Sequence, residues 1–252
     1  MTTGSAVTSG DRAARDTGAG DPLPGAAYAL ARRFAAGATM WCVAPAWPEH
    51  GRHVAVEFVH PVIIGTRALP AVSITGPDPV AAVRAVARPG DIVLAVSTTD
   101  DPVVAEVLHR APAWGVTTAW VASGPPPANA RADLMVRVDD PERSAPYDGR
   151  LVLLYHLLWE LTHVCFEHPG LLRDPPVDAE EVCITCRDEG RLAEVLGPTA
   201  DGIDTEVRTA MGIETVDVSL VGPVGRDDLL LVHAGAAIAT VDTSGLGPGS
   251  DR

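Results

Sequence analysis

Lysine is absent from this sequence, and basic residues are scarce relative to acidic ones. All 19 residues in the Lys plus Arg count are arginines, against 33 Asp and Glu, which gives a formal net charge of -14 at pH 7. Nucleic acids and anionic membrane surfaces are polyanions that attract basic protein surfaces. The charge therefore argues against both as partners.

Long hydrophobic runs are also missing. No stretch approaches the roughly 20 apolar residues of a membrane span, and the first residues have no apolar core of the kind a signal peptide carries. We therefore expect a cytoplasmic protein, in which thiols stay reduced. Its four cysteines, Cys42, Cys165, Cys183 and Cys186, are then buried apolar residues or carry chemistry, and do not form a disulfide framework.

What is present is an ordinary globular composition, 46% hydrophobic over 252 residues, enough for one large domain or two modest ones. Residues 1–25 are rich in Gly, Ser, Thr, Asp and Ala and predict a disordered tail. Residues 26–167 mix strand and helix patterns, and 168–181 form a linker rich in Pro and acid. Residues 182–243 are β-rich, and 244–252 predict a second disordered tail.

The first domain alternates strands with helices. Such an order predicts a doubly wound parallel sheet between two layers of helices, an αβα sandwich. The predicted strands span 38–46, 68–74, 91–98, 117–123 and 134–139, and the predicted helices span 50–62, 79–87, 102–114 and 150–166.

The second domain has short β-rich runs and no helical pattern. Turn signals at Gly197-Pro198, Asp201-Gly202 and Gly222-Pro223 separate these runs. Strands at such spacing predict a small β-barrel.

A first candidate site follows the strand 91–98. Ser97, Thr98 and Thr99 precede a helix, and hydroxyls beside helix N-terminal amides can cradle a phosphate. The alternative is a turn that only caps its own helix, and spacing alone favours this alternative.

Three segments resemble the phosphosugar isomerase (SIS) family, particularly sedoheptulose-7-phosphate isomerase. They read RPGDIVLAVSTTDDPVVAEVLHRAPAWGVTTAWV (88–121), HVAVEFVHPVIIGTRALPAVSI (53–74) and LLYHLLWELTHVCFE (153–167). The resemblance implies phosphosugar binding by Ser97, Thr98 and Thr99, a catalytic position at Glu57, and a homo-oligomer formed through this domain.

The chain also departs from that family. Its glycine-serine loop is replaced by residues 45–51, which read PAWPEHG, and Asp100 and Asp101 stand where the family has Gly-Asn. By resemblance, the histidine that completes the acid/base pair falls on Leu151, and His156 aligns with another histidine one helical turn further on. An isomerase needs two positioned proton carriers. We therefore expect a fold that has lost isomerase activity and serves in phosphosugar sensing or oligomerisation.

A second candidate site lies in the β-rich domain, where Cys183 and Cys186 form a C-x-x-C pair and His233 lies further along the chain. The pair is compatible with a zinc half-site, but closed zinc sites have four ligands. It is also compatible with a redox pair, although such pairs usually begin a helix. The remaining alternative is a set of ordinary strand residues.

Residues 183–242 resemble a whole domain of the HypC/HupF family of hydrogenase maturation chaperones, most specifically near the end, where 216–242 read VDVSLVGPVGRDDLLLVHAGAAIATVD. The resemblance implies that Cys183 and His233 hold the iron of a transient Fe(CN)2(CO) unit, with Cys186 as a possible second thiol and no nucleotide. It also implies two partners, a HypD-like maturation protein and the hydrogenase large-subunit precursor. Soft thiolate and imidazole donors suit such an iron unit.

The leading prediction from the sequence is therefore a maturation chaperone for nickel–iron (NiFe) hydrogenase that hands over the iron unit and is not an enzyme. The alternative prediction is a phosphosugar isomerase of the sedoheptulose-7-phosphate type, or a sugar-phosphate-binding regulator.

Overall fold

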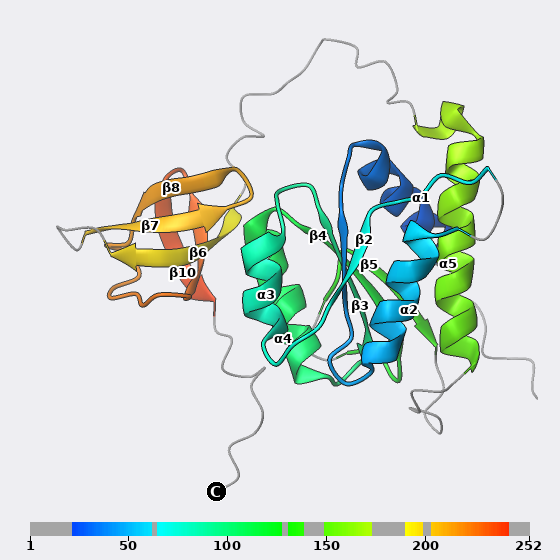
Figure 1. Ribbon diagram of the computed structural model, residues 1–252. Helices are drawn as coiled ribbons and strands as arrows, with labels where there is room; N and C mark the ends of the chain where they lie inside the picture. Colours follow the sequence, from blue (N-terminus) through cyan, green and yellow to red (C-terminus); the bar gives the residue numbers. More distant parts are fainter. Residues whose placement is uncertain are drawn as a thin grey trace, which may run out of the picture.

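Two sheets of different kinds organise the chain. The computed structural model (Figure 1) describes residues 22–61, 65–127, 131–138, 149–172, 190–198 and 203–241. The first sheet is five-stranded with the order β2-β1-β3-β4-β5, and all its described pairings are parallel. Its strands are β1 (Met40–Val43), β2 (Ala71–Ile74), β3 (Ile92–Thr98), β4 (Thr117–Ser123) and β5 (Leu134–Val138).

Helices cover both faces of this sheet, as Figure 1 shows. On one face, α1 (Pro22–Ala35), α2 (Pro48–Val59) and α5 (Gly149–Glu167) share a core with the strands. On the other, α3 (Pro79–Val86), α4 (Pro102–Arg110) and the 3-10 turn η1 (Ala111–Trp114) pack against it. The predicted αβα sandwich with a parallel sheet is confirmed.

Local chemistry explains most element boundaries. The central strand β3 is buried on both faces up to Ser97, as its continuous apolar run predicts. Helix α3 begins after Asp78, whose side chain accepts from the Ala81 N–H. Pro112 has no N–H and disfavours a continuous α-helix, so the predicted helix 102–114 divides into α4 and η1.

Helix α1 is the main element that the sequence reading missed. It begins at Pro22, so residues 22–25 of the predicted tail 1–25 are helical. Its buried residues Leu23, Ala26, Ala27 and Leu30 follow the spacing of one helix face. Smaller differences are that α2 ends at Val59 and that β1 is confined to Met40–Val43.

The second sheet closes into a barrel with the strand order β10-β8-β7-β6-β9. Its strands are β6 (Arg191–Pro198), β7 (Asp204–Thr209), β8 (Gly212–Asp217), β9 (Leu229–His233) and β10 (Ala236–Val241). Ala234 and Gly235 both have positive φ, 49° and 82°, and make the tight turn between β9 and β10. A small barrel over residues 182–243 was predicted, and residues 182–189 at its start lie outside the described part.

The barrel is docked on the α3, α4 and η1 side of the sandwich. Glu194 of β6 is 0% exposed and accepts from the Trp114 indole N–H at 3.0 Å. Arg110 Nη1 donates to the same carboxylate at 3.3 Å, and Arg84 Nη1 lies 3.5 Å from it. Leu229 joins the apolar core beneath α3 and α4. Within the described residues, the two domains therefore share both a polar network and an apolar core.

No helix in the described ranges is both long enough and apolar enough to cross a membrane.

Candidate functional site

Two imidazoles and a carboxylate converge between α2 and α5. His53 and Glu57 lie one turn apart on α2, with His53 Nε2 3.2 Å from Glu57 Oε1. His156 of α5 brings its Nε2 to 3.6 Å from the same oxygen. The side chains of His53, Glu57 and His156 are 42%, 19% and 34% exposed, so solvent and ligands reach them. We call these three residues the His–Glu centre.

A backbone carbonyl one turn earlier in α5 fixes the orientation of the His156 ring. Its Nδ1 lies 2.7 Å from the carbonyl oxygen of Val152. A carbonyl only accepts, so Nδ1 carries the proton, and in the neutral ring Nε2 presents a lone pair to Glu57. Two acceptors at this separation repel each other unless a proton or a cation lies between them. The centre is therefore built to hold a positive charge.

Tyr155 extends the His–Glu centre inward. Its hydroxyl lies 3.0 Å from His53 Nδ1 and 3.3 Å from His50 Nδ1. A consistent assignment has His50 donate to the tyrosine oxygen and the hydroxyl donate to His53, which then donates from Nε2 to Glu57. Burial, and secondly the charge of Glu57, raise the pKa of Tyr155 to about 12, so it remains protonated near neutral pH.

The donor set fits a divalent metal when the hydrogen bonds through Tyr155 reverse, so that His53 donates from Nδ1 and offers an Nε2 lone pair. One ligand atom from each of His53, Glu57 and His156 lies within 4.8 Å of the others. Two imidazole nitrogens and one carboxylate oxygen are donors that Zn²⁺ takes in catalytic sites, where a further position is left for water or substrate. The carbonyl behind His156 Nδ1 is the outer contact typical of a metal-binding histidine.

A second feature lies where β3 ends. An open hollow of about 480 Å³ is lined by Pro45, Ala46, Thr98, Asp100, Asp101, Pro102 and Val103. Of the residues predicted to bind a phosphosugar, Thr98 is the one that lines it. Ser97 is 0% exposed, donates to the Thr98 carbonyl and accepts from the Trp120 indole. Thr99 is nearly buried, and its N–H donates to the Ser123 carbonyl.

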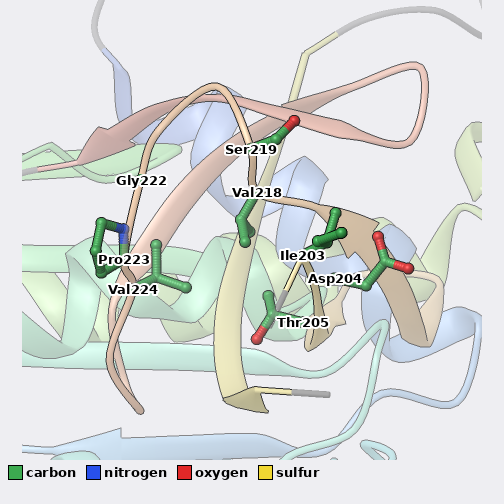
Figure 2. Close-up of a pocket in the computed structure, with 8 residues that line it drawn as sticks. All are labelled: Ile203, Asp204, Thr205, Val218, Ser219, Gly222, Pro223 and Val224. Carbon is green, nitrogen blue, oxygen red and sulfur yellow. The ribbon is translucent and has the colours of Figure 1, made fainter. Parts of the chain in front are cut away.

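In the barrel, a hollow of about 430 Å³ opens between the start of β7 and the loop after β8 (Figure 2). Its walls are mostly apolar, with Val218, Pro223 and Val224 from the loop and Ile203 at the start of β7. His233 is not among its lining residues and lies half-buried at the end of β9. Cys183 and Cys186 lie outside the described residues, so the iron site they were predicted to form stays a prediction.

Searches of protein-family models and of curated proteins find no match. Among solved structures, a phosphoheptose isomerase from Francisella tularensis matches with a TM-score of 0.51 at 16% identity, over 59% of this chain and 88% of that one. The phosphoheptose isomerase GmhA from Neisseria gonorrhoeae gives 0.48 at 18% identity, over 57% and 85%. The first of these matches shows that the α/β domain has the SIS phosphosugar isomerase fold. These similarities give no support to a HypC/HupF domain.

Glu57 was predicted from the sequence as the catalytic position, and His156 was aligned with another family histidine but given no role. The partner histidine was expected at Leu151, which is fully buried in the core, whereas His156 lies beside Glu57. His53 was not named, although His53 and Glu57 stand four positions apart in a predicted helix, and that spacing places both on one face. Tyr155 and His156 meet α2 through tertiary packing, for which the sequence carries no local signal.

Proposed function

We propose that the α/β domain acts on a sugar or sugar-like carbonyl compound, and that the His–Glu centre transfers a proton between neighbouring carbons. The reaction class is aldose–ketose isomerisation. The observation that carries the proposal is the approach of His156 Nε2 to Glu57 Oε1 at 3.6 Å, with Nδ1 tied to a carbonyl. This replaces the expectation that only one proton carrier remains.

The chemistry follows from the two side chains. The Glu57 carboxylate removes a proton from the carbon next to the carbonyl, while His156 in its protonated form gives one to the carbonyl oxygen. The resulting enediol returns to a carbonyl compound when Glu57 delivers its proton to the neighbouring carbon and His156 takes the hydroxyl proton. Tyr155, held protonated, orients His53 through its hydroxyl. A divalent metal at the same atoms is the alternative: it would polarise the carbonyl as a Lewis acid, with Glu57 and His156 as its ligands in place of proton carriers.

The test is exchange of substrate carbon-bound hydrogen with solvent. The full chain is incubated in D2O with a panel of free and phosphorylated aldoses and ketoses, with and without Zn²⁺, and deuterium at the carbon beside the carbonyl is followed by NMR. We expect exchange that falls at least about a hundredfold in Glu57→Gln, in line with the usual contribution of one acid/base group. Glu49→Gln is the matched control, because Glu49 lies on the same helix and its side chain is 79% exposed.

Binding without exchange in the wild type would point to a sugar-binding regulator instead. Neither binding nor exchange for any member of the panel would contradict the proposal.

Self-association is a second proposal for this domain. Helix α5 exposes Leu153, Leu157 and Val164 by 57%, 37% and 36%, and neighbouring α2 exposes Val56 by 55%. Leu153 and Leu157 lie one turn apart on the same helix face. Exposed apolar side chains that adjoin are typical of interaction surfaces, and a second copy of the chain offers the same surface for an isologous contact. Sedimentation velocity of the wild type and of Leu153→Asp tests this, with a dimer expected only for the wild type.

For the barrel, we propose the hydrogenase maturation role on its sequence resemblance alone. In this role Cys183 and His233 carry the Fe(CN)2(CO) unit between a HypD-like protein and the hydrogenase large-subunit precursor. The test is the infrared spectrum of protein purified with the HypD-like partner. Cyanide and carbonyl bands that vanish in Cys183→Ala are expected, and a well-folded complex without such bands would contradict the role.

A further inference from the structure

The start of α4 is already occupied by a carboxylate from the chain itself. Asp101 Oδ1 accepts from the Val103 N–H at 2.9 Å and from the Val104 N–H at 3.1 Å. Asp101 is only 9% exposed. Helix N-terminal amides are the donors that a phosphate group uses at such a position. Here Asp101 takes the two amides that an incoming anion would need.

Two other donors at this strand end, from Ser97 and Thr99, are also engaged. The Ser97 hydroxyl donates to the Thr98 carbonyl, and the Thr99 N–H donates to the Ser123 carbonyl. Gly124 presses close to Thr99, because a Cβ at Gly124 would lie 2.8 Å from Thr99 Oγ1. A phosphate placed here would have to break contacts that the fold already makes.

The negative charge of the hollow also disfavours phosphate binding. Among the described residues, those that line the hollow at the end of β3 include Asp100 and Asp101 and no arginine or histidine. Two carboxylates set a negative potential over the hollow, and a phosphate dianion would be repelled by both. A neutral hydroxyl-rich group meets no such penalty and can donate to the carboxylates.

We infer that Asp101 is a specificity-determining residue that keeps the anion site of this SIS fold closed, so that the domain takes sugars without a phosphate group. The substrate class is a neutral polyhydroxy aldehyde or ketone. The inference rests on the proposed function for the reaction, but the closure of the anion site stands on the hydrogen bonds of Asp101 alone.

The first test measures inorganic phosphate binding to the full chain by calorimetry and ³¹P NMR. Asp101→Ser keeps a capping oxygen but removes the charge, and it should raise phosphate affinity at least about tenfold over wild type. The control is Asp78→Ser, which changes the corresponding cap of α3, where the Asp78 carboxylate accepts from the Ala81 N–H at 2.9 Å. Asp78→Ser should bind phosphate no better than wild type.

Asp101→Asn is a second variant of nearly the same shape, in case the serine variant does not fold. If either variant folds, as judged by circular dichroism, and gains no affinity for phosphate over wild type, the inference is overturned. It is also overturned if the wild type itself binds phosphate as tightly as the variants do.

The second test compares D-ribose with D-ribose 5-phosphate, and D-fructose with D-fructose 6-phosphate, in the deuterium exchange assay. The wild type should prefer the free sugar of each pair, and Asp101→Ser should shift the preference toward the phosphate ester. A wild-type preference for the esters overturns the inference and leaves the proposed function intact. If Asp101→Ser gains affinity for phosphate but no sugar exchanges deuterium, the result supports the closed anion site and overturns the proposed function.

Discussion

The molecule contains two clusters of ionisable side chains that differ in how completely they are satisfied. In the His–Glu centre, the side chain of Glu57 is 19% exposed, and a lone pair of His156 faces it. In the second cluster, which we call the docking cluster, Glu194 is 0% exposed and is held by Arg84, Arg110 and Trp114. Each cluster joins segments far apart in the sequence.

This difference distinguishes a functional site, the His–Glu centre, from a structural contact between the two domains, the docking cluster. Every carboxylate oxygen of Glu194 has a donor, two of its partners are cations, and Arg110 also donates to the Asp227 carbonyl at 2.7 Å. Because both oxygens of Glu194 already have donors within the protein, the docking cluster is not arranged to bind a ligand. In the His–Glu centre, the acceptor atoms of Glu57 and His156 instead face each other and are open to solvent. This arrangement costs stability and is useful for binding a cation or moving a proton.

Breaking the docking cluster should have the largest effect on stability. Glu194→Ala removes the acceptor of the buried Trp114 indole N–H and one carboxylate partner each of Arg84 and Arg110, which keep their ion pairs with Asp227 and Glu106. We expect a loss of about 3 kcal/mol in the free energy of unfolding. Urea denaturation followed by tryptophan fluorescence measures it. Glu206→Gln is the control, because Glu206 is exposed on the adjacent strand β7. A Glu194 variant as stable as that control would mean that the docking cluster does not hold the barrel.

Close packing of Gly115 against the barrel, at the same contact between the domains, predicts the next largest effect on stability. Gly115 has φ +73°, and a Cβ there would lie 3.0 Å from the Cα of Ala210 in the barrel and 3.0 Å from the Pro89 side chain. Gly115→Ala therefore strains the backbone and pushes the barrel away, at a cost of about 1–3 kcal/mol.

Gly25→Ala is the matched control for that change. Gly25 is helical and has nothing within 4 Å of its ideal Cβ position, so alanine there should leave stability unchanged or raise it by up to about 1 kcal/mol. Thermal unfolding of both variants measures the difference. Equal effects of the two substitutions would contradict close packing between Gly115 and the barrel.

A smaller, pH-dependent effect on stability is expected from Cys42, which is buried in the core between the sheet and helices α1, α2 and α5. Burial raises the pKa of the Cys42 thiol from 9.0 to about 12. Above pH 9 the unfolded chain loses this proton while the folded chain keeps it, so stability is fully present below pH 9 and declines toward pH 12. The slope is about 1.4 kcal/mol per pH unit.

Urea denaturation of wild type and Cys42→Ala at pH 8, 9 and 10 isolates this contribution. The variant loses some packing at every pH, but the difference between the two proteins should shrink as the pH rises above 9. A difference that stays constant over this range would show that Cys42 is not buried as described.

Much of the fold could be predicted from the sequence, because it depends on local patterns. The apolar run before Ser97 gave β3, and the alternation of strands and helices gave the parallel sheet and its two helical layers. Helix α1 was missed because its residues follow a Gly-rich segment, and its helical spacing begins at Leu23, within the predicted tail.

The candidate site was less predictable, because it depends on contacts between helices. Glu57 could be named by resemblance, but the resemblance placed its partner at Leu151, one turn away from the histidine that reaches it. Ser97 and Thr99 had the right residue types for phosphate, yet their hydrogen bonds are used within the fold. Which polar groups remain open to a ligand is decided by tertiary packing.

The most direct test of the account is a Zn²⁺ titration of the full chain, by calorimetry, in wild type, Glu57→Gln and Glu49→Gln. Because Cys183, Cys186 and His233 offer other ligands, the Glu57 difference assigns the site. We predict saturable binding that weakens at least about tenfold in Glu57→Gln, which removes one of three ligands, and is unchanged in Glu49→Gln. Equal Zn²⁺ affinity in wild type and Glu57→Gln would contradict the assignment of His53, Glu57 and His156 as metal ligands.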